Sequence, residues 1–172
     1  MLDRLDQALA RVSMALAVCG CVIVAGQFFL IIVDVTIRTT GVTPPGFTLA
    51  TVEYGLLYFA MFSAPYLVRQ RGHVTIEAIV AHLPRRVSRA LARIVYLVCS
   101  TVSFLFAWFS LQLLMEALAS MEVDLRGIDI PLWLKYLPLA PCFALVGLEF
   151  LRYLLGRASY YSYDLGEVKD GV

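Results

Sequence analysis

The sequence predicts an all-α integral membrane protein with four transmembrane helices. Sixty per cent of its residues are hydrophobic and 16 per cent are charged, whereas about a quarter of the residues in a soluble domain are charged. Residues 12–33 and 94–115 carry no charge, and such runs of about 22 residues cross roughly 30 Å of hydrocarbon. We therefore expect one membrane domain over residues 1–172.

The first span is expected at about residues 12–37. Its apolar run is too long for a signal-peptide core, so we expect it to remain in the mature chain. Before it, Leu2, Leu5, Leu9 and Val12 recur at helical spacing. This pattern predicts either a short amphipathic N-terminal helix on the membrane surface or a frayed polar terminus.

Three small or polar residues of the first span recur seven apart and share one helix face: Gly20, Gln27 and Asp34. Lipid cannot satisfy an amide or a carboxylate, so this face is predicted to meet protein. The contact is either another helix of this chain or a partner subunit within the membrane. Alternatively, Asp34 pairs with Arg38 one turn later and both reach the membrane surface.

The second span is expected at about residues 48–68, after a turn that contains Pro44, Pro45 and Gly46. Glu53 lies in its first turns. This acid caps the helix dipole, interacts with Arg38, or contacts a partner. All three roles place Glu53 near one membrane surface.

Residues 69–93 form a basic loop with a single acid, Glu77, and six arginines: Arg69, Arg71, Arg85, Arg86, Arg89 and Arg93. Short arginine-rich loops stay on the cytoplasmic side, because moving guanidinium groups through hydrocarbon is costly. The loop also contains His73, whose neighbours Arg69 and Arg71 suit a basic belt at the lipid headgroups.

The third span is expected at about residues 94–117. It carries a stripe of small residues at which another backbone can approach, and helices of the same chain are the favoured contact. The stripe consists of Ser100, Ser103, Ala107, Ser110 and Ala117. Trp108 is expected to face lipid.

The fourth span is expected at about residues 131–155, after an acidic connection. Trp133 suits the membrane surface, and Pro138 with Pro141 is predicted to kink the helix. Near its other end, Glu149 and Arg152 are three residues apart and can form a local ion pair.

The distribution of basic residues predicts that both termini are cytoplasmic. Eleven of the fourteen lysines and arginines fall at the termini or in the central loop. The other three are Arg38, Arg126 and Lys135, in the two outer connections.

Catalysis and nucleic-acid binding are not indicated. The two histidines lie in the cytoplasmic loop, the four cysteines fall inside apolar runs, and no phosphate-binding glycine loop or zinc-ligand spacing is present. We expect no cofactor. A stand-alone four-helix transporter needs an acid deep in the membrane, whereas the acids here lie near span ends. A membrane adaptor is a further alternative.

Two motifs resemble the small membrane subunit of tripartite ATP-independent periplasmic (TRAP) transporters. The segment APYLVRQRGHVTIEAIVAHLPRRVSRAL resembles that family's glycine-histidine-valine stretch, and IDIPLWLKYLPLAP resembles its isoleucine-proline-x-tryptophan stretch. Length, four spans and orientation agree, so the resemblance covers nearly the whole chain.

The resemblance implies a heteromeric system in the bacterial inner membrane. A periplasmic substrate-binding protein captures an organic acid, and a large polytopic subunit transports it with a cation gradient, usually sodium, at its own ion sites. The small subunit scaffolds the large one and helps to dock the binding protein. Expected docking or assembly residues are Arg38, Glu53, Arg126, Asp129, Trp133 and Lys135. Residues expected to set the topology and to contact lipid headgroups or the large subunit are Arg69, Arg71, His73, Arg85 and Arg86.

Overall fold

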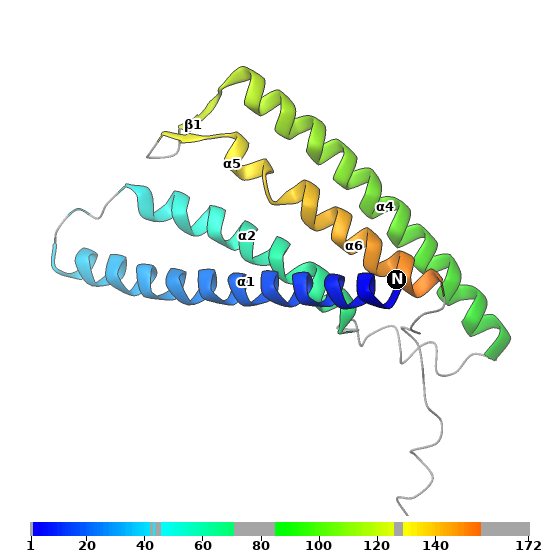
Figure 1. Cartoon of the computed structure of the whole chain (residues 1–172). Helices are drawn as coiled ribbons and strands as arrows, with labels where there is room; N and C mark the ends of the chain where they lie inside the picture. Colours follow the sequence, from blue (N-terminus) through cyan, green and yellow to red (C-terminus); the bar gives the residue numbers. More distant parts are fainter. Residues whose placement is uncertain (1, 42, 44–45, 71–84, 126–128, 156–172) are drawn as a thin grey trace, which may run out of the picture.

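The structure, a computed structural model, describes residues 2–41, 43, 46–70, 85–125 and 129–155. Its long helices are α1 (Leu2–Thr39), α2 (Phe47–Arg69), α4 (Arg85–Ser120) and α6 (Leu139–Leu154), and α5 (Trp133–Tyr136) is a short helix before α6. Strands β1 (Val123–Leu125) and β2 (Asp129–Pro131) precede α5 (Figure 1).

Within the described part of the chain, four helical segments are long and apolar enough to cross a membrane: Asp6–Thr39, Phe47–Arg69, Ala90–Ser120 and Trp133–Leu154. The prediction of an all-α protein with four spans is confirmed. The predicted boundaries of the second and fourth spans agree closely with these segments. The first and third helices extend further toward their N-termini than the apolar runs alone indicated.

Helix α1 continues through the N-terminal segment as one element of 38 residues. The separate surface helix that the leucine spacing allowed is therefore absent from the described residues. No glycine or proline interrupts the chain between residues 2 and 19, so nothing in this segment ends the helix before the first span. As a result, Asp6 belongs to the same continuous helix as the first span.

The helices form two antiparallel pairs. In the first helix pair α1 packs along α2, and in the second helix pair α4 packs along α6. The two pairs meet mainly through α2 and α6. We call the end with β1 and β2 the β-hairpin end, and the opposite end, where α1 begins and α2 and α6 finish, the charged end (Figure 1).

A stripe of small residues holds α4 against α6. Ser100, Ser103, Ser110 and Ala117 are all buried, and the Ser100 hydroxyl donates a hydrogen bond to the Gly147 carbonyl over 3.1 Å. This confirms that the stripe packs helices of the same chain.

The kink predicted in the fourth span lies at Pro138. This residue separates α5 from α6 and precedes the first residue of α6. Pro141 lies in the first turn of α6, where a missing N–H removes no intrahelical hydrogen bond. Only Pro138 therefore interrupts the span.

Large apolar side chains cover the outward surfaces of α1 and α4. Val22 and Phe29 on α1 are 67% and 71% exposed, and Trp108 on α4 is 60% exposed. In water such surfaces would cause association, but hydrocarbon solvates them. Their position agrees with the expected lipid contact of Trp108.

Candidate functional site

At the β-hairpin end, β1, β2 and α5 form a small cap, which is bound to the first helix pair. The Tyr54 hydroxyl donates to Asp124 Oδ2 over 3.1 Å, and the Tyr58 hydroxyl donates to the Leu134 carbonyl over 2.7 Å. Both tyrosines belong to α2, whereas their acceptors belong to β1 and α5. The two hydrogen bonds fix the cap of the second helix pair on the first.

The cap itself is a short antiparallel ladder. Strand β1 pairs with β2 so that Asp124 lies opposite Ile130, and the Leu132 N–H donates to the Glu122 carbonyl over 3.0 Å. Three-residue strands have little stability of their own. The contacts with α2 therefore contribute much of the order at this end.

The predicted docking residues that the structure describes lie at this end of the molecule. Arg38 lies in the last turn of α1, Glu53 lies in the first half of α2, and Asp129 begins β2; all three are exposed. Trp133 and Lys135 belong to α5 and are partly buried. Arg126 lies outside the described residues.

The polar face of α1 contacts α2 of the same chain. Gln27 Nε2 donates to the Val52 carbonyl over 3.0 Å, and Gly20 lies beside Ser63 and Phe59. This matches the first of the two contacts expected from the sevenfold spacing. A partner contact at Gly20, Gln27 and Asp34 remains a prediction, which the packing of these residues does not require.

Asp34 closes this polar face near the β-hairpin end. It is 8% exposed, and Arg38 Nε donates to its Oδ2 over 2.6 Å. The Arg38 side chain remains 60% exposed. The pair expected one helical turn apart is therefore present, with the acid buried and the base at the surface.

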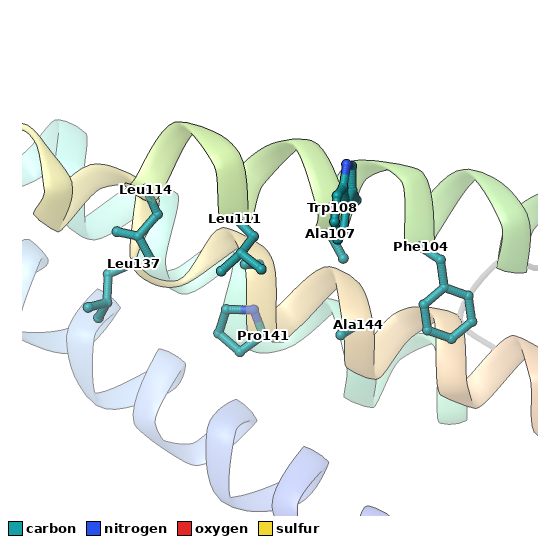
Figure 2. Close-up of a pocket in the computed structure, with 9 residues that line it drawn as sticks. Phe104, Ala107, Trp108, Leu111, Leu114, Leu137, Pro141 and Ala144 are labelled. Atoms are coloured by element: carbon teal, nitrogen blue, oxygen red, sulfur yellow. The ribbon is translucent and has the colours of Figure 1, made fainter. Parts of the chain in front are cut away.

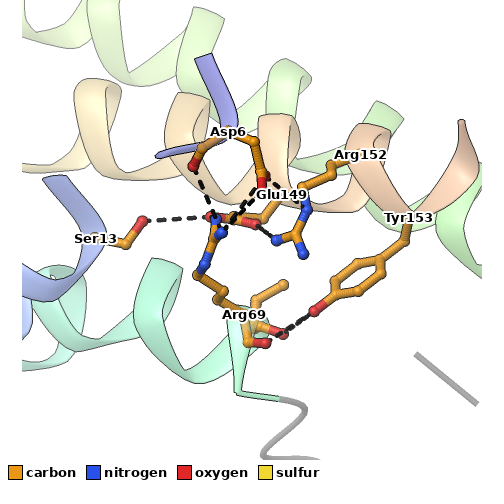
Figure 3. Close-up of polar contacts among 7 residues, drawn as sticks. Asp6, Ser13, Arg69, Glu149, Arg152 and Tyr153 are labelled. Atoms are coloured by element: carbon orange, nitrogen blue, oxygen red, sulfur yellow. Dashed lines mark hydrogen bonds and ion pairs between the residues drawn. The ribbon is translucent and has the colours of Figure 1, made fainter. Parts of the chain in front are cut away.

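The charged end holds two acidic and two basic side chains in a closed ring, which we call the charged ring: Asp6, Arg69, Glu149 and Arg152. The Glu149 side chain is fully buried, with 0% exposure, and lies between the two guanidinium groups (Figure 3). Arg69 Nη1 is 2.9 Å from Glu149 Oε1, and Arg152 Nη1 is 2.9 Å from Glu149 Oε2.

Asp6 completes the ring from α1. Its Oδ1 forms an ion pair with Arg152 Nε at 2.9 Å, and its Oδ2 lies 3.4 Å from Arg69 Nη2. Ser13, also on α1, donates to Glu149 Oε1 over 3.5 Å. The predicted local pair of Glu149 and Arg152 is confirmed, but it is only one side of the ring.

The remaining residues expected at this end differ in how far the structure describes them. The Arg69 side chain is 17% exposed, so most of it lies within the ring and little is left for lipid headgroups. Arg85 and Arg86 begin α4, but their side chains lie outside the described part of the structure. Arg71 and His73 lie outside the described residues.

An open groove between α4 and α6 has an apolar lining (Figure 2). The side chains around it include Phe104, Trp108, Leu111, Leu137 and Pro141. A carboxylate needs hydrogen-bond donors or a positive charge, and this lining supplies neither beyond the indole of Trp108 at its edge. The groove is therefore unsuited to binding an organic acid.

No group of three histidine, cysteine, aspartate or glutamate residues that could hold a metal ion occurs among the described residues. Cys19 and Cys21 are exposed on α1, Cys99 is partly exposed and Cys142 is buried, and all four are free thiols. The described residues contain two polar assemblies, the cap and the charged ring.

One family model matches residues 27–159. Its description is tripartite ATP-independent periplasmic transporters, DctQ component. The match begins in α1 and covers α2, α4, the cap and α6. Comparisons with curated proteins and with solved structures give no significant match.

Proposed function

Because the chain belongs to the DctQ family and is the small membrane component of a tripartite transporter, we propose that it scaffolds the large transport subunit and helps to dock the substrate-binding protein. These two partners are the other components that a tripartite transporter implies. The four membrane-spanning segments make the chain a multi-pass membrane protein, and we place it in the bacterial inner membrane.

In this proposal the large subunit carries the transported organic acid and the coupling ion, usually sodium. The apolar lining of the groove between α4 and α6 supports a division of labour in which this chain binds neither. Among the described residues of the β-hairpin end, the buried acid is Asp34, which is already paired with Arg38. A sodium gradient is then used by the complex, without an ion site in this chain.

The observation that carries the docking proposal is the construction of the β-hairpin end. Exposed charges of both signs lie at this end: Asp129 is on the cap, whereas Arg38 and Glu53 are on the adjoining ends of α1 and α2. Hydrogen bonds from Tyr54 and Tyr58 of α2 bind the cap to the first helix pair. Charged groups at the rim of an interface steer association and set its orientation. We assign this end to the periplasm, in agreement with its few basic residues.

Charge reversal on the cap tests this docking surface. Asp129→Lys alters an exposed side chain on β2, so it leaves the helix packing intact. In proteoliposomes that contain the whole complex, we expect the concentration of binding protein at half-maximal uptake to change by about 1.4- to fivefold, since an exposed charge pair contributes about 0.2–1 kcal/mol.

The matched control is Gln7→Lys, which adds positive charge at an exposed position of α1 near the charged end. It should leave the half-saturating concentration unchanged. Docking at the β-hairpin end is contradicted if Asp129→Lys behaves like this control, or if Gln7→Lys has the larger effect.

A further inference from the structure

The charged ring joins segments that are far apart in the chain and belong to different helix pairs. Asp6 and Arg69 come from α1 and α2, the first helix pair. Glu149 and Arg152 come from α6, in the second helix pair. Each helix pair thus contributes one acid and one base, and the ring has no net charge.

The contacts within the ring alternate between helix pairs. Arg69 with Glu149 and Arg152 with Asp6 are both 2.9 Å ion pairs that cross between the pairs. Arg152 with Glu149, at 2.9 Å, and Arg69 with Asp6, at 3.4 Å, are contacts within a pair. Every charged group therefore has one opposite charge in its own helix pair and one in the other.

The ring also supplies the polar contact between α1 and α6. Elsewhere α1 packs chiefly along α2, and α6 packs along α4 and α2. At the charged end, by contrast, Asp6 and Ser13 of α1 reach Arg152 and Glu149 of α6. These side chains therefore add a direct link between α1 and the second helix pair to the packing of α2 against α6.

A hydrophobic cluster lies beside the ring. Val68, Ala92, Tyr96 and Tyr153 are buried together from α2, α4 and α6. The Tyr153 hydroxyl donates to the carbonyls of Val68 and Arg69, over 3.1 and 3.0 Å. The ring is therefore shielded from solvent on this side, where a lost opposite charge could not be replaced by water.

We propose that the charged ring specifies how the two helix pairs pack against each other. At this end each pair already carries one acid and one base before the pairs meet. A single carboxylate or guanidinium at a membrane-spanning segment opposes insertion, whereas a local pair of opposite charges reduces that penalty. When the helix pairs meet, each charge gains its second, crosswise partner. A buried network of this kind specifies one arrangement more than it adds stability.

Exchanging the positions of the acid and the base within one helix pair tests this proposal. Asp6→Arg with Arg69→Asp keeps the first pair balanced but sets like charges against Arg152 and Glu149. In the second pair, Glu149→Arg with Arg152→Glu does the same. Combining all four substitutions restores the alternating ring, so the two exchanges should rescue each other.

The reactivity of the Cys142 thiol measures, in the full-length chain, whether the two helix pairs are packed together. Cys142 is 2% exposed and precedes Glu149 by seven residues and Tyr153 by eleven, so the three share the face of α6 that meets α2. Its reaction with an apolar maleimide in mild detergent is measured by peptide mass spectrometry. Cys19 and Cys21, both exposed, are the internal references for thiol reactivity.

We expect either exchange alone to raise the Cys142 labelling rate by at least about tenfold, because like charges face each other across the ring. The fourfold variant should label at nearly the native rate. All variants should be recovered from the membrane fraction in native amounts. A control substitution, Arg11→Asp, changes an exposed charge of α1 outside the ring and should not alter labelling.

Three results would overturn the proposal. Native labelling rates in the single exchanges would mean that the ring does not hold the helix pairs together. Continued fast labelling in the fourfold variant would mean that the ring does not act by crosswise pairing. Loss of either exchange variant from the membrane fraction would show that charge balance within a helix pair is insufficient for insertion.

Discussion

Replacing Gly55 with alanine should disrupt the contact between α1 and α2 at one defined hydrogen bond. A Cβ at position 55 would overlap Gln27 Nε2 and would lie 2.8 Å from its Cδ. The Gln27 side chain therefore has to move. Gln27 is 7% exposed, so moving it breaks the 3.0 Å hydrogen bond to the Val52 carbonyl without giving the amide access to water.

The expected change in the free energy of unfolding is the sum of two opposing effects. Leaving a buried amide without its partner costs about 1–3 kcal/mol, although interhelical hydrogen bonds in membranes are often worth only about 0.6–1.7 kcal/mol. Glycine to alanine in a helix gains about 1 kcal/mol. Gly55→Ala should then destabilise the native chain by about 1 kcal/mol.

The sign of this effect should reverse when Gln27 is shortened. In the Gln27→Ala background the methyl group that Gly55→Ala adds meets no amide. The substitution then keeps only its gain in helix propensity and should raise the free energy of unfolding by about 1 kcal/mol. The two backgrounds differ by a coupling free energy of about 2 kcal/mol. Reversible unfolding of the four proteins in mixed micelles measures this coupling as a double-mutant cycle.

Gly26→Ala is the matched control, because nothing lies within 4 Å of a Cβ at that position. It should stabilise the chain by about 1 kcal/mol in both backgrounds. The reasoning is refuted if Gly55→Ala stabilises the native chain as much as Gly26→Ala does, or if its effect is the same with and without Gln27.

Two further predictions concern the cap and the orientation. Tyr58→Phe removes the 2.7 Å hydrogen bond to the Leu134 carbonyl and should lower the unfolding free energy by about 0.6–1.7 kcal/mol. An unchanged value would mean that this contact does not hold the cap. Reporter domains inserted after Thr43 and Arg126 should be periplasmic and one after Ser88 cytoplasmic; a periplasmic signal at Ser88 would contradict the orientation.

The helices and the packing between them were largely predictable from the sequence. Uncharged runs and the small-residue stripe on the third span depend on composition and helical period, which are local properties. The contact face of Gln27 followed from the same period, whereas Gly55 was not singled out. A lone glycine in an apolar helix gives no signal until the side chain facing it is known.

The charged ring was not predictable, because its members are distant in sequence. Glu149 and Arg152 are three residues apart and explain each other locally, which removed any reason to look for Arg69. Asp6 lay on the polar side of a segment expected either on the membrane surface or frayed. Its contact with the ring depends on α1 continuing without a break, which spacing alone did not decide.

The strands of the cap were also missed. Each has three residues in an acidic connection, too short for a detectable alternating pattern. Their order depends on Tyr54 and Tyr58 from another helix pair. Contacts between different helix pairs cannot be predicted until the packing of the two pairs is known.

Purification of the native complex tests the central claim most directly. The chain, tagged after Val172, is extracted from its own host in mild detergent, and its partners are identified by mass spectrometry. The account predicts a large polytopic membrane protein in about equal molar amount. Recovery of the chain alone or as a homodimer that still binds an organic acid would contradict its role as the scaffold of a separate transport subunit.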